Sequence, residues 1–272
     1  MQTYVDTDTG AGKNTVLVTR PQARAAEFID LLNDNGFNAL AFSSIEIQPV
    51  KLNAQIENQL KSLNEYDYII FISINAVEQA AGFMQQLNLK PQSISTKIAT
   101  IGKATFKAAN QAGFKVNISP EKGFNSESLL ALNELQREQI NGSRCLIIRG
   151  LGGLEKLADE LRQRGAQVDY AEVYRREKPA QDKNISRRQL SEKWQSFKIN
   201  AITVSSNEAL QNLYDMLEQP GKSVMLKTNV IVASQRGVSL AKKLGFRSVI
   251  CAQSAMNQHM LAALKNELEP VK

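Results

Sequence analysis

The chain has few of the residues from which metal centres, disulfide scaffolds and catalytic triads are built. Its 272 residues include two cysteines, one histidine and one tryptophan. Cys145 and Cys251 form no CxxC pair and lie in or beside apolar segments, so we expect both to be reduced packing residues. His259 is predicted to lie on a C-terminal helix in a surface or packing role, because neither a Ser/His/Asp triad nor an HExxH site can be built from it. We expect no metal and no disulfide.

Long apolar runs are also missing. No segment contains eighteen or more consecutive apolar residues, which would be needed to cross a bilayer as a helix. Residues 1–14 are polar and acidic, without the basic flank and apolar centre of a signal peptide. We therefore expect a cytoplasmic protein with no membrane partner, and a mobile tail over residues 1–13.

Acidic residues are outnumbered by basic ones, 27 to 33, which gives a formal charge of +6. This excess favours an anionic partner. The basic residues are scattered along the sequence, and no segment resembles a zinc finger, an RNP strand or a basic helix. The charge therefore does not identify the anionic partner, and the scattered basic residues and missing motifs argue against nucleic acid.

A repeated unit accounts for most of the chain: an apolar strand, a short polar turn, a helix that ends in glycine, and often a second strand. Copies occupy residues 14–42, 97–118, 144–170 and 229–250, and related units occupy 66–84 and 199–217. We expect Asn75 and Asn207 to cap the helices of the last two units. The helix-ending glycines are predicted to adopt a left-handed conformation; they are Gly36, Gly113, Gly165 and Gly245.

Strands that alternate with helices of this length predict an α/β fold with doubly wound parallel sheets, and the duplicated set predicts two such domains. Two extended, proline-containing segments, 41–53 and 170–184, are candidate crossings between them. In one arrangement a domain of residues 14–42 plus 176–272 encloses a second domain of 43–175, with linker strands near 43–50 and 170–177. The alternative is two sequential domains divided once near residue 175.

Polar and cationic side chains follow the ends of six predicted strands. Because the carboxyl ends of parallel strands share one edge of a sheet, where helix N-termini offer free N–H groups, these turns are the expected ligand site. Four of the turns contain a cation, so we predict a cleft that binds an anion with several charged groups. The turn residues are Thr19 and Arg20, Ser73 and Asn75, Lys103 and Thr105, Arg149 and Gly150, Ser205 to Asn207, and Ser234 and Arg236.

Established cofactor motifs do not fit. The stretch CLIIRGLGGLEK resembles a dinucleotide fingerprint, but Glu155 stands where the third glycine is required, and no GxxxxGK[ST] motif occurs. Tyr174, in a predicted linker, has two open interpretations: a proton or hydrogen-bond donor to the ligand, or a tyrosine packed against a neighbouring strand. Any catalysis would then depend mainly on positioning the substrate.

A collinear set of short motifs resembles the uroporphyrinogen-III synthase family. The motifs are VLVTRP, FISINAV, IATIGKAT, NSESLL, CLIIRGLGG, EVYRR, ITVSS and VIVAS, spread over residues 14–268. The resemblance implies two α/β domains joined by a two-stranded linker, with the crossed arrangement preferred. It also implies a lyase of haem biosynthesis that needs no cofactor: hydroxymethylbilane, a linear tetrapyrrole with eight carboxylates, loses its hydroxyl, inverts ring D and closes to uroporphyrinogen III.

The same resemblance assigns roles to individual residues. Tyr174 matches a linker tyrosine thought to help the hydroxyl leave, and Thr105 matches a threonine in a glycine turn. Further matched residues would hold carboxylates through side chains or N–H groups: Arg20, Ser73, Asn75, Ser126, Arg149, Gly150, Ser205 and Ser206, to which the turn analysis adds Lys103 and Arg236. We expect a monomer with a transient hand-off from hydroxymethylbilane synthase. The alternatives are a two-domain nucleotide-sugar glycosyltransferase and a non-catalytic sensor of an anionic metabolite.

Overall fold

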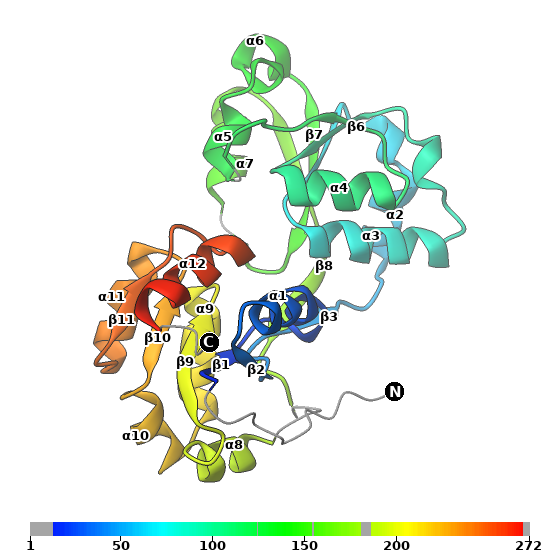
Figure 1. The fold of residues 1–272 in the computed structure, drawn as a ribbon. Coiled ribbons are helices and arrows are strands. Elements are labelled where there is room, and N and C mark those ends of the chain that lie inside the picture. The colour runs from blue at the N-terminus through cyan, green and yellow to red at the C-terminus, as the bar shows by residue number, and fades with distance from the viewer. Residues whose placement is uncertain (1–12, 124, 154, 181–185, 269–272) are drawn as a thin grey trace. The chain divides into compact units, whose positions relative to one another are not determined.

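The computed structural model describes residues 13–123, 125–153, 155–180 and 186–268, so the N-terminal tail expected over residues 1–13 lies almost wholly outside the described residues. Two compact units are present, one formed by the residues up to Glu46 together with those from Glu177 onward, the other by Ile47–Arg176. The chain passes from the first unit to the second after Glu46 and returns after Arg176. Each unit contains one sheet (Figure 1).

The first unit is built on a five-stranded sheet with the order β11-β10-β9-β1-β2, in which all neighbours pair in parallel. Counted along the chain, this is the 2-1-3-4-5 order of flavodoxin-like folds, with its topological switch point between β1 and β9. Its elements are β1 (Thr15–Val18), α1 (Gln22–Asp34), β2 (Asn38–Ala41), α8 (Arg187–Lys193), β9 (Ile199–Val204), α9 (Asn207–Met216), α10 (Gly221–Met225), β10 (Asn229–Val232), α11 (Gln235–Leu244), β11 (Val249–Cys251) and α12 (Asn257–Glu267).

Both faces of this sheet are covered because its strands are apolar on both sides, as in β1, where all four residues are buried. Val16 and Val18 pack with Phe28 of α1 and Met260 of α12 in one core cluster. Leu17, between the two valines, points to the other face, where α9 and α11 contact each other and the strands. The unit is therefore doubly wound.

The second unit contains a six-stranded sheet with the order β3-β8-β7-β4-β5-β6. Because β4 is followed by β5 on one side and β7 on the other, the switch point lies between β4 and β7. Its elements are β3 (Glu46–Pro49), α2 (Ala54–Lys61), η1 (Leu63–Glu65), β4 (Tyr68–Phe71), α3 (Ile74–Gln86), η2 (Pro91–Ser93), β5 (Lys97–Thr100), α4 (Lys103–Gln111), β6 (Val116–Ile118), α5 (Ser126–Leu130), η3 (Asn133–Leu135), α6 (Arg137–Ile140), β7 (Arg144–Gly150), α7 (Lys156–Gln163) and β8 (Gln167–Glu177).

Two apolar clusters cover the two faces of the second sheet. Helices α3 and α4, which lie side by side in Figure 1, pack on one face with Ile69, Phe71 and Ile148 of the strands. Helices α5 and α7 pack on the other face against Ile70 and Ile147. Neighbouring residues of a strand belong to different clusters because successive side chains point to opposite faces of the sheet. The predicted α/β class with doubly wound parallel sheets is confirmed.

The helix ends agree with the sequence at their C-termini and differ at two N-termini. The four glycines expected to be left-handed have φ between 81° and 95°. Asn75 and Asn207, however, do not cap their helices, and that prediction is wrong. The caps are Ser73 and Ser206. Their backbone is extended, so each hydroxyl accepts a hydrogen bond from the backbone N–H three residues later in the helix.

The two cysteines differ in environment. Cys145 lies in β7 and is fully buried, as predicted, whereas Cys251 ends the edge strand β11 and is exposed, so its expected packing role is wrong. Both are free thiols. Burial, with a smaller contribution from the charge of Asp67, raises the pKa of Cys145 to about 12.

This difference predicts selective thiol reactivity, since the thiolate is the reactive form. At pH 8 in the folded protein, a thiol reagent should modify Cys251 quickly and Cys145 far more slowly, and both should react in denaturant. The Cys251→Ser variant is the control and should contain no rapidly reacting thiol when folded. Rapid modification of that variant would contradict the buried position of Cys145.

Candidate active site

Each sheet places predicted site residues directly at its switch point. In the second unit Ser73 follows β4 and Gly150 ends β7. In the first unit Thr19 and Arg20 follow β1, and Ser205 follows β9. Ligands of open parallel sheets bind outside the carboxyl ends of the strands at such points. The sequence pattern thus located the edge of each sheet where binding is expected.

Tyr174 is the residue most tightly built into the switch point of the second unit. Its side chain is fully buried, and its hydroxyl lies 3.2 Å from Ser73 Oγ and 3.3 Å from Arg176 Nη2. Ser73 Oγ also accepts a hydrogen bond from Ala76 N at the start of α3. A phenol is therefore held between a helix-capping hydroxyl and a guanidinium. Of the two interpretations of Tyr174, the structure realises the packed one and also places its hydroxyl at the expected ligand edge.

A register shift between β7 and β8 creates this position. Arg149 pairs with Glu172, but the next pair is Gly150 with Tyr174, so β8 gains one residue at the bulge. The phenol ring then lies against the backbone of Gly150: a Cβ built there would be 2.6 Å from ring atoms Cε2 and Cζ. Bulges commonly redirect a side chain beside an active site. Only a residue without a side chain fits opposite Tyr174.

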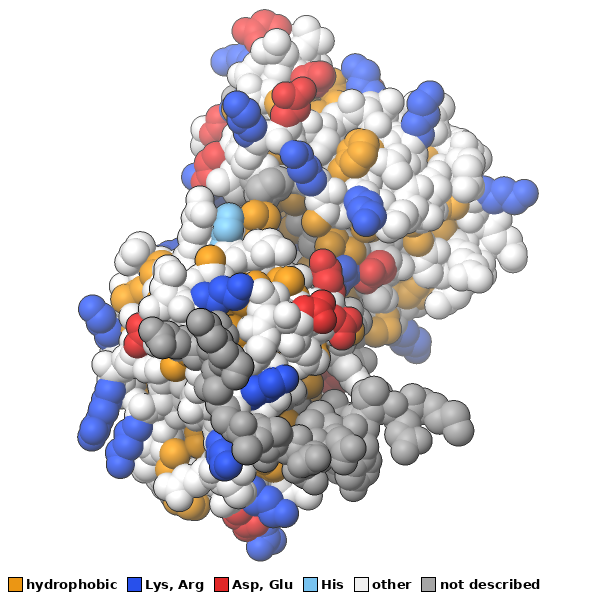
Figure 2. All heavy atoms as spheres, in the orientation of Figure 1, with side chains coloured by type: hydrophobic (Ala, Val, Ile, Leu, Met, Phe, Trp, Pro, Cys, Tyr) orange, Lys and Arg blue, Asp and Glu red, His pale blue; other side chains and the backbone are white. Residues whose placement is uncertain are grey.

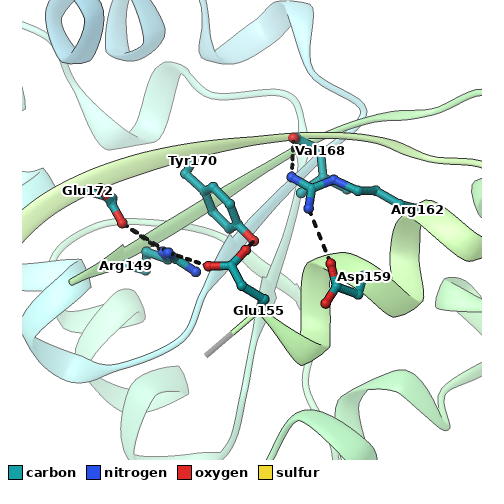
Figure 3. A network of polar contacts seen from close by, with 7 residues as sticks. All are labelled: Arg149, Glu155, Asp159, Arg162, Val168, Tyr170 and Glu172. Atoms are coloured by element: carbon teal, nitrogen blue, oxygen red, sulfur yellow. Dashed lines mark hydrogen bonds and ion pairs between the residues drawn. The ribbon is translucent and has the colours of Figure 1, made fainter. Parts of the chain in front are cut away.

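Arg149 is held by the chain's own carboxylates (Figure 3). Its side chain is 5% exposed, its Nη2 lies 2.8 Å from Glu155 Oε1, and its Nε and Nη2 lie 3.1 and 3.0 Å from Glu172 Oε1. The guanidinium carbon lies 3.8 Å from the centre of the Tyr170 ring, and the Tyr170 hydroxyl donates to Glu155. The predicted cation of this turn is thus already paired with two carboxylates.

The pKa values in this network follow from the pairing. Hydrogen bonds from Tyr170 and then Arg149 lower the pKa of Glu155 from its ordinary value. Burial opposes the charge of Arg149, but hydrogen bonds to Glu155 and Glu172 raise its pKa overall. Burial and the bond to Glu155 raise the pKa of Tyr170. The arrangement favours a charged Glu155 and a neutral Tyr170, which fixes the turn between β7 and α7.

The other predicted residues of the second unit lie at different depths. Asn75 is half-buried in the first turn of α3. Lys103 is the exposed first residue of α4, whose N-cap is Gly102, and Thr105 is buried in the same turn. Ser126 begins α5, on the opposite face of the sheet from α3 and α4. Ser126 is therefore separated by the sheet from the group around Tyr174.

In the first unit, two threonine hydroxyls join strands β1 and β9 by hydrogen bonds at the switch point. Thr19 Oγ1 donates to Thr203 O at 2.9 Å, and Thr203 Oγ1 donates to Leu17 O at 3.2 Å. Arg20 extends from this point: its guanidinium carbon lies 4.8 Å from the centre of the Phe28 ring and its Nη2 donates to Ala255 O at 2.6 Å. Burial lowers the pKa of Arg20 despite the opposing charge of Glu27.

The remaining residues of that edge are at helix starts. Ser206 caps α9 and Ser234 caps α11. Ser205, the residue before Ser206, is half-buried. Arg236 is exposed in the first turn of α11. His259 lies on α12, as predicted, and its Nδ1 is 2.8 Å from Ser254 Oγ. Two helix N-termini with serine caps therefore flank the edge next to the switch point.

Basic side chains are spread over the surface. Figure 2 shows Lys and Arg on both units without one continuous basic block on the visible face. Within the described ranges, no three His, Cys, Asp or Glu side chains are grouped as a metal would require. The helices described include none that is long and apolar enough to span a bilayer.

The sequence missed the residues that fix the site in place. Glu172, Glu155 and Tyr170 surround Arg149, and Arg176 contacts Tyr174, yet none was predicted to take part. One signal was available: Glu172 and Arg149 have opposite charges on consecutive strands, and the register pairs them directly.

The contact between Gly150 and Tyr174 predicts the effect of adding one methyl group. Gly150→Ala should lower the free energy of unfolding by about 1–3 kcal/mol, because the tyrosine ring must move out of a packed core. The matched control is Gly82→Ala in α3, where a Cβ meets nothing within 4 Å. That variant should gain about 0.5–1 kcal/mol from helix propensity. Chemical denaturation measures both, and a neutral Gly150→Ala would contradict the close contact.

The lowered pKa of Glu155 predicts a pH-dependent stability. A glutamate in the unfolded chain titrates near about 4.3, so the contribution of Glu155 is fully present above that pH. It is lost as the pH falls through this value toward the lower pKa of the folded state. The difference in thermal midpoint between wild type and Glu155→Gln should therefore be largest near pH 7 and shrink toward pH 3. Glu138→Gln, an exposed carboxylate outside the network, controls for the loss of one charge; a difference that does not depend on pH would contradict the pairing.

Comparison with known proteins agrees with this architecture. A sequence profile of the family described as Uroporphyrinogen-III synthase HemD matches residues 26–262. The uroporphyrinogen-III synthase of Escherichia coli is 32% identical over 252 residues, which cover 92% of this chain and 100% of the relative. That of Proteus mirabilis is 40% identical over 164 residues, 60% of this chain and 80% of the relative.

Solved structures show the same fold. The uroporphyrinogen-III synthetase of Helicobacter pylori aligns with a TM-score of 0.60 at 13% identity, over 94% of this chain and 100% of that one. A mutant uroporphyrinogen III synthase of Thermus thermophilus aligns with a TM-score of 0.59 at 15% identity, over 95% and 100%. Because the family profile spans most of the sequence and the E. coli relative matches along its whole length, the chain belongs to the uroporphyrinogen-III synthase family.

Proposed function

We propose that this member of the family closes hydroxymethylbilane to uroporphyrinogen III with Tyr174 as the acid that assists loss of the substrate hydroxyl. Family membership supports the reaction, that of a cyclising lyase of tetrapyrrole biosynthesis. The observation that carries the assignment of Tyr174 is the position of its hydroxyl at the switch point of the second unit, fixed by Ser73 and Arg176. A phenol and the N-terminus of α3 lie together at this point.

The chemistry needs few catalytic groups. The bilane has a hydroxymethyl group at one end and can close unaided to the type I isomer, so the enzyme must hold the chain in a shape that inverts ring D. Protonation of the leaving hydroxyl by Tyr174 gives water and an electrophilic methylene carbon. The rest of the task is to fold a flexible molecule with eight carboxylates, and we expect it to require no cofactor.

Carboxylate binding is proposed for the strand-end turns of each unit. An anion at a helix N-terminus gains about 0.3–2 kcal/mol from the orphan N–H groups and the dipole. Helices α3, α4, α9 and α11 supply such termini, and Arg20, Lys103 and Arg236 add cations beside three of the turns. The full proposed set is Arg20, Ser73, Asn75, Lys103, Thr105, Ser126, Gly150, Ser205, Ser206 and Arg236.

Arg149 takes a different part in this proposal from the one the sequence indicated. Because Glu155 and Glu172 already accept its hydrogen bonds, we assign Arg149 to holding the turn between β7 and α7 in place. Its direct use by a substrate carboxylate would require one of these pairs to open, which costs the energy of a partly buried ion pair.

The alternatives from the sequence are less well supported. The nucleotide-sugar glycosyltransferase rested on the paired doubly wound sheets and the non-catalytic sensor on the expected anion binding, whereas the family match names a reaction. The crossed domain boundaries, the cytoplasmic location, the monomeric state and the hand-off from hydroxymethylbilane synthase remain proposals; the two compact units support the first of these.

The experiment that tests the function is incubation with freshly made hydroxymethylbilane and separation of the product isomers. Wild type should give the type III isomer, and a product that is type I alone would contradict the proposed function. In the same assay Tyr174→Phe should lower kcat by roughly 100-fold or more, the usual contribution of a positioned acid. Tyr66→Phe, which removes a hydrogen bond to Asp169 in the same unit, is the matched control and should retain activity. Equal activity of the two variants would remove the acid role from Tyr174.

A further inference from the structure

We propose that Arg176 is a positioning residue for Tyr174: its guanidinium donates to the phenol oxygen, leaves the phenol proton for the substrate, and stabilises the negative charge that remains once the proton is transferred. The inference rests on the proposed role of Tyr174 as the acid. Neither the motif pattern nor the turn analysis assigned a role to Arg176.

The geometry of β8 brings the two side chains together. Residues two apart on a strand point to the same face, so Arg176 follows Tyr174 along that face. Its Nη2 lies 3.3 Å from the Tyr174 hydroxyl, and its guanidinium carbon lies 5.7 Å from the centre of the ring. The phenol is fully buried while Arg176 is exposed. Arg176 is therefore an exposed cation in contact with a buried phenol.

Hydrogen-bond accounting shows what this contact does. A guanidinium can only donate, so the phenol oxygen must be the acceptor in its bond with Arg176. Ser73 Oγ accepts from Ala76 N, and in its 3.2 Å contact with the Tyr174 hydroxyl either hydroxyl can donate. Arg176 therefore does not use the phenol proton, and when Ser73 also donates, the phenol oxygen accepts from both and its proton is used by neither. In that arrangement the phenol proton is available for the substrate.

The charge balance of the step favours a cation at this place. The phenol proton moves to the substrate hydroxyl oxygen, the C–O bond breaks with its electron pair going to oxygen, and water leaves. The substrate is left with a positive methylene carbon and Tyr174 with a negative oxygen 3.3 Å from Arg176 Nη2 in the present geometry. A charge-assisted hydrogen bond becomes stronger as that charge develops, so it lowers the barrier more than it strengthens binding. The proton released from carbon at ring closure restores the phenol.

Arg175 provides a matched comparison within the same strand. It is also exposed, carries the same charge, and precedes Arg176 by one residue, so its side chain points to the other face of β8. Substitution of either arginine removes one positive charge from the same place in the sequence. Only substitution of Arg176 removes the donor to Tyr174.

The test compares steady-state kinetics on hydroxymethylbilane for Arg176→Met, Arg176→Lys and Arg175→Met. Arg176→Met should lower kcat by roughly 10- to 100-fold, the value of a hydrogen bond to a charged group, with little change in KM. Arg176→Lys should restore part of the loss because it keeps a charged donor. Arg175→Met should retain the wild-type kcat, and unfolding midpoints of all variants establish that they are folded.

A double variant separates this inference from the proposed function. If Arg176 acts through the phenol, Arg176→Met should have little further effect in a Tyr174→Phe background, whereas independent effects would multiply. Multiplying effects, a loss confined to KM, or equal kcat for Arg176→Met and Arg175→Met would overturn the inference while leaving Tyr174 as the acid. An unchanged kcat in Tyr174→Phe would overturn both.

Discussion

The contact of the Tyr174 ring with the bare backbone of Gly150 is the constraint on which the candidate site depends. It requires a residue without a side chain at the end of β7 and a bulge in β8 that advances the pairing by one position. With regular pairing, Gly150 would face Val173 and the phenol would point to the other side of the sheet. One register irregularity therefore decides whether a hydroxyl lies near Ser73 at the switch point.

The parallel topology explains why so many polar residues gather at strand ends in both units. Each sheet is covered on both faces by helices that pack apolar side chains against it, so most buried strand residues are apolar and polar groups concentrate where the strands end. The switch points at β1/β9 and β4/β7 open the helix layers just there, and serine caps leave helix N–H groups beside them. Burial of both faces of each sheet makes the core apolar and leaves the polar side chains gathered at one edge of the sheet.

Much of the fold and part of the site followed from the sequence, for identifiable reasons. Strand, turn and helix recur with clear periodicity, so the doubly wound class and the strand-end positions of Arg20, Ser73 and Gly150 were predictable. The helix caps were misassigned because Ser73 and Asn75 both favour an N-terminus, and the backbone conformation decides between them. The partners of Arg149 and Tyr174 depend on strand register and on a bulge, which hydrophobic periodicity does not encode.

The Arg149 network changes the electrostatic character of the glycine turn that follows β7. One guanidinium there is matched by two glutamates, so the side chains of this group sum to a negative charge at neutral pH. The glycine turn before a helix resembles an anion-binding turn, but the carboxylates of Glu155 and Glu172 repel anions there. A negatively charged group that approaches it would depend more on main-chain dipoles, which act only along a given direction, than on the charge of Arg149.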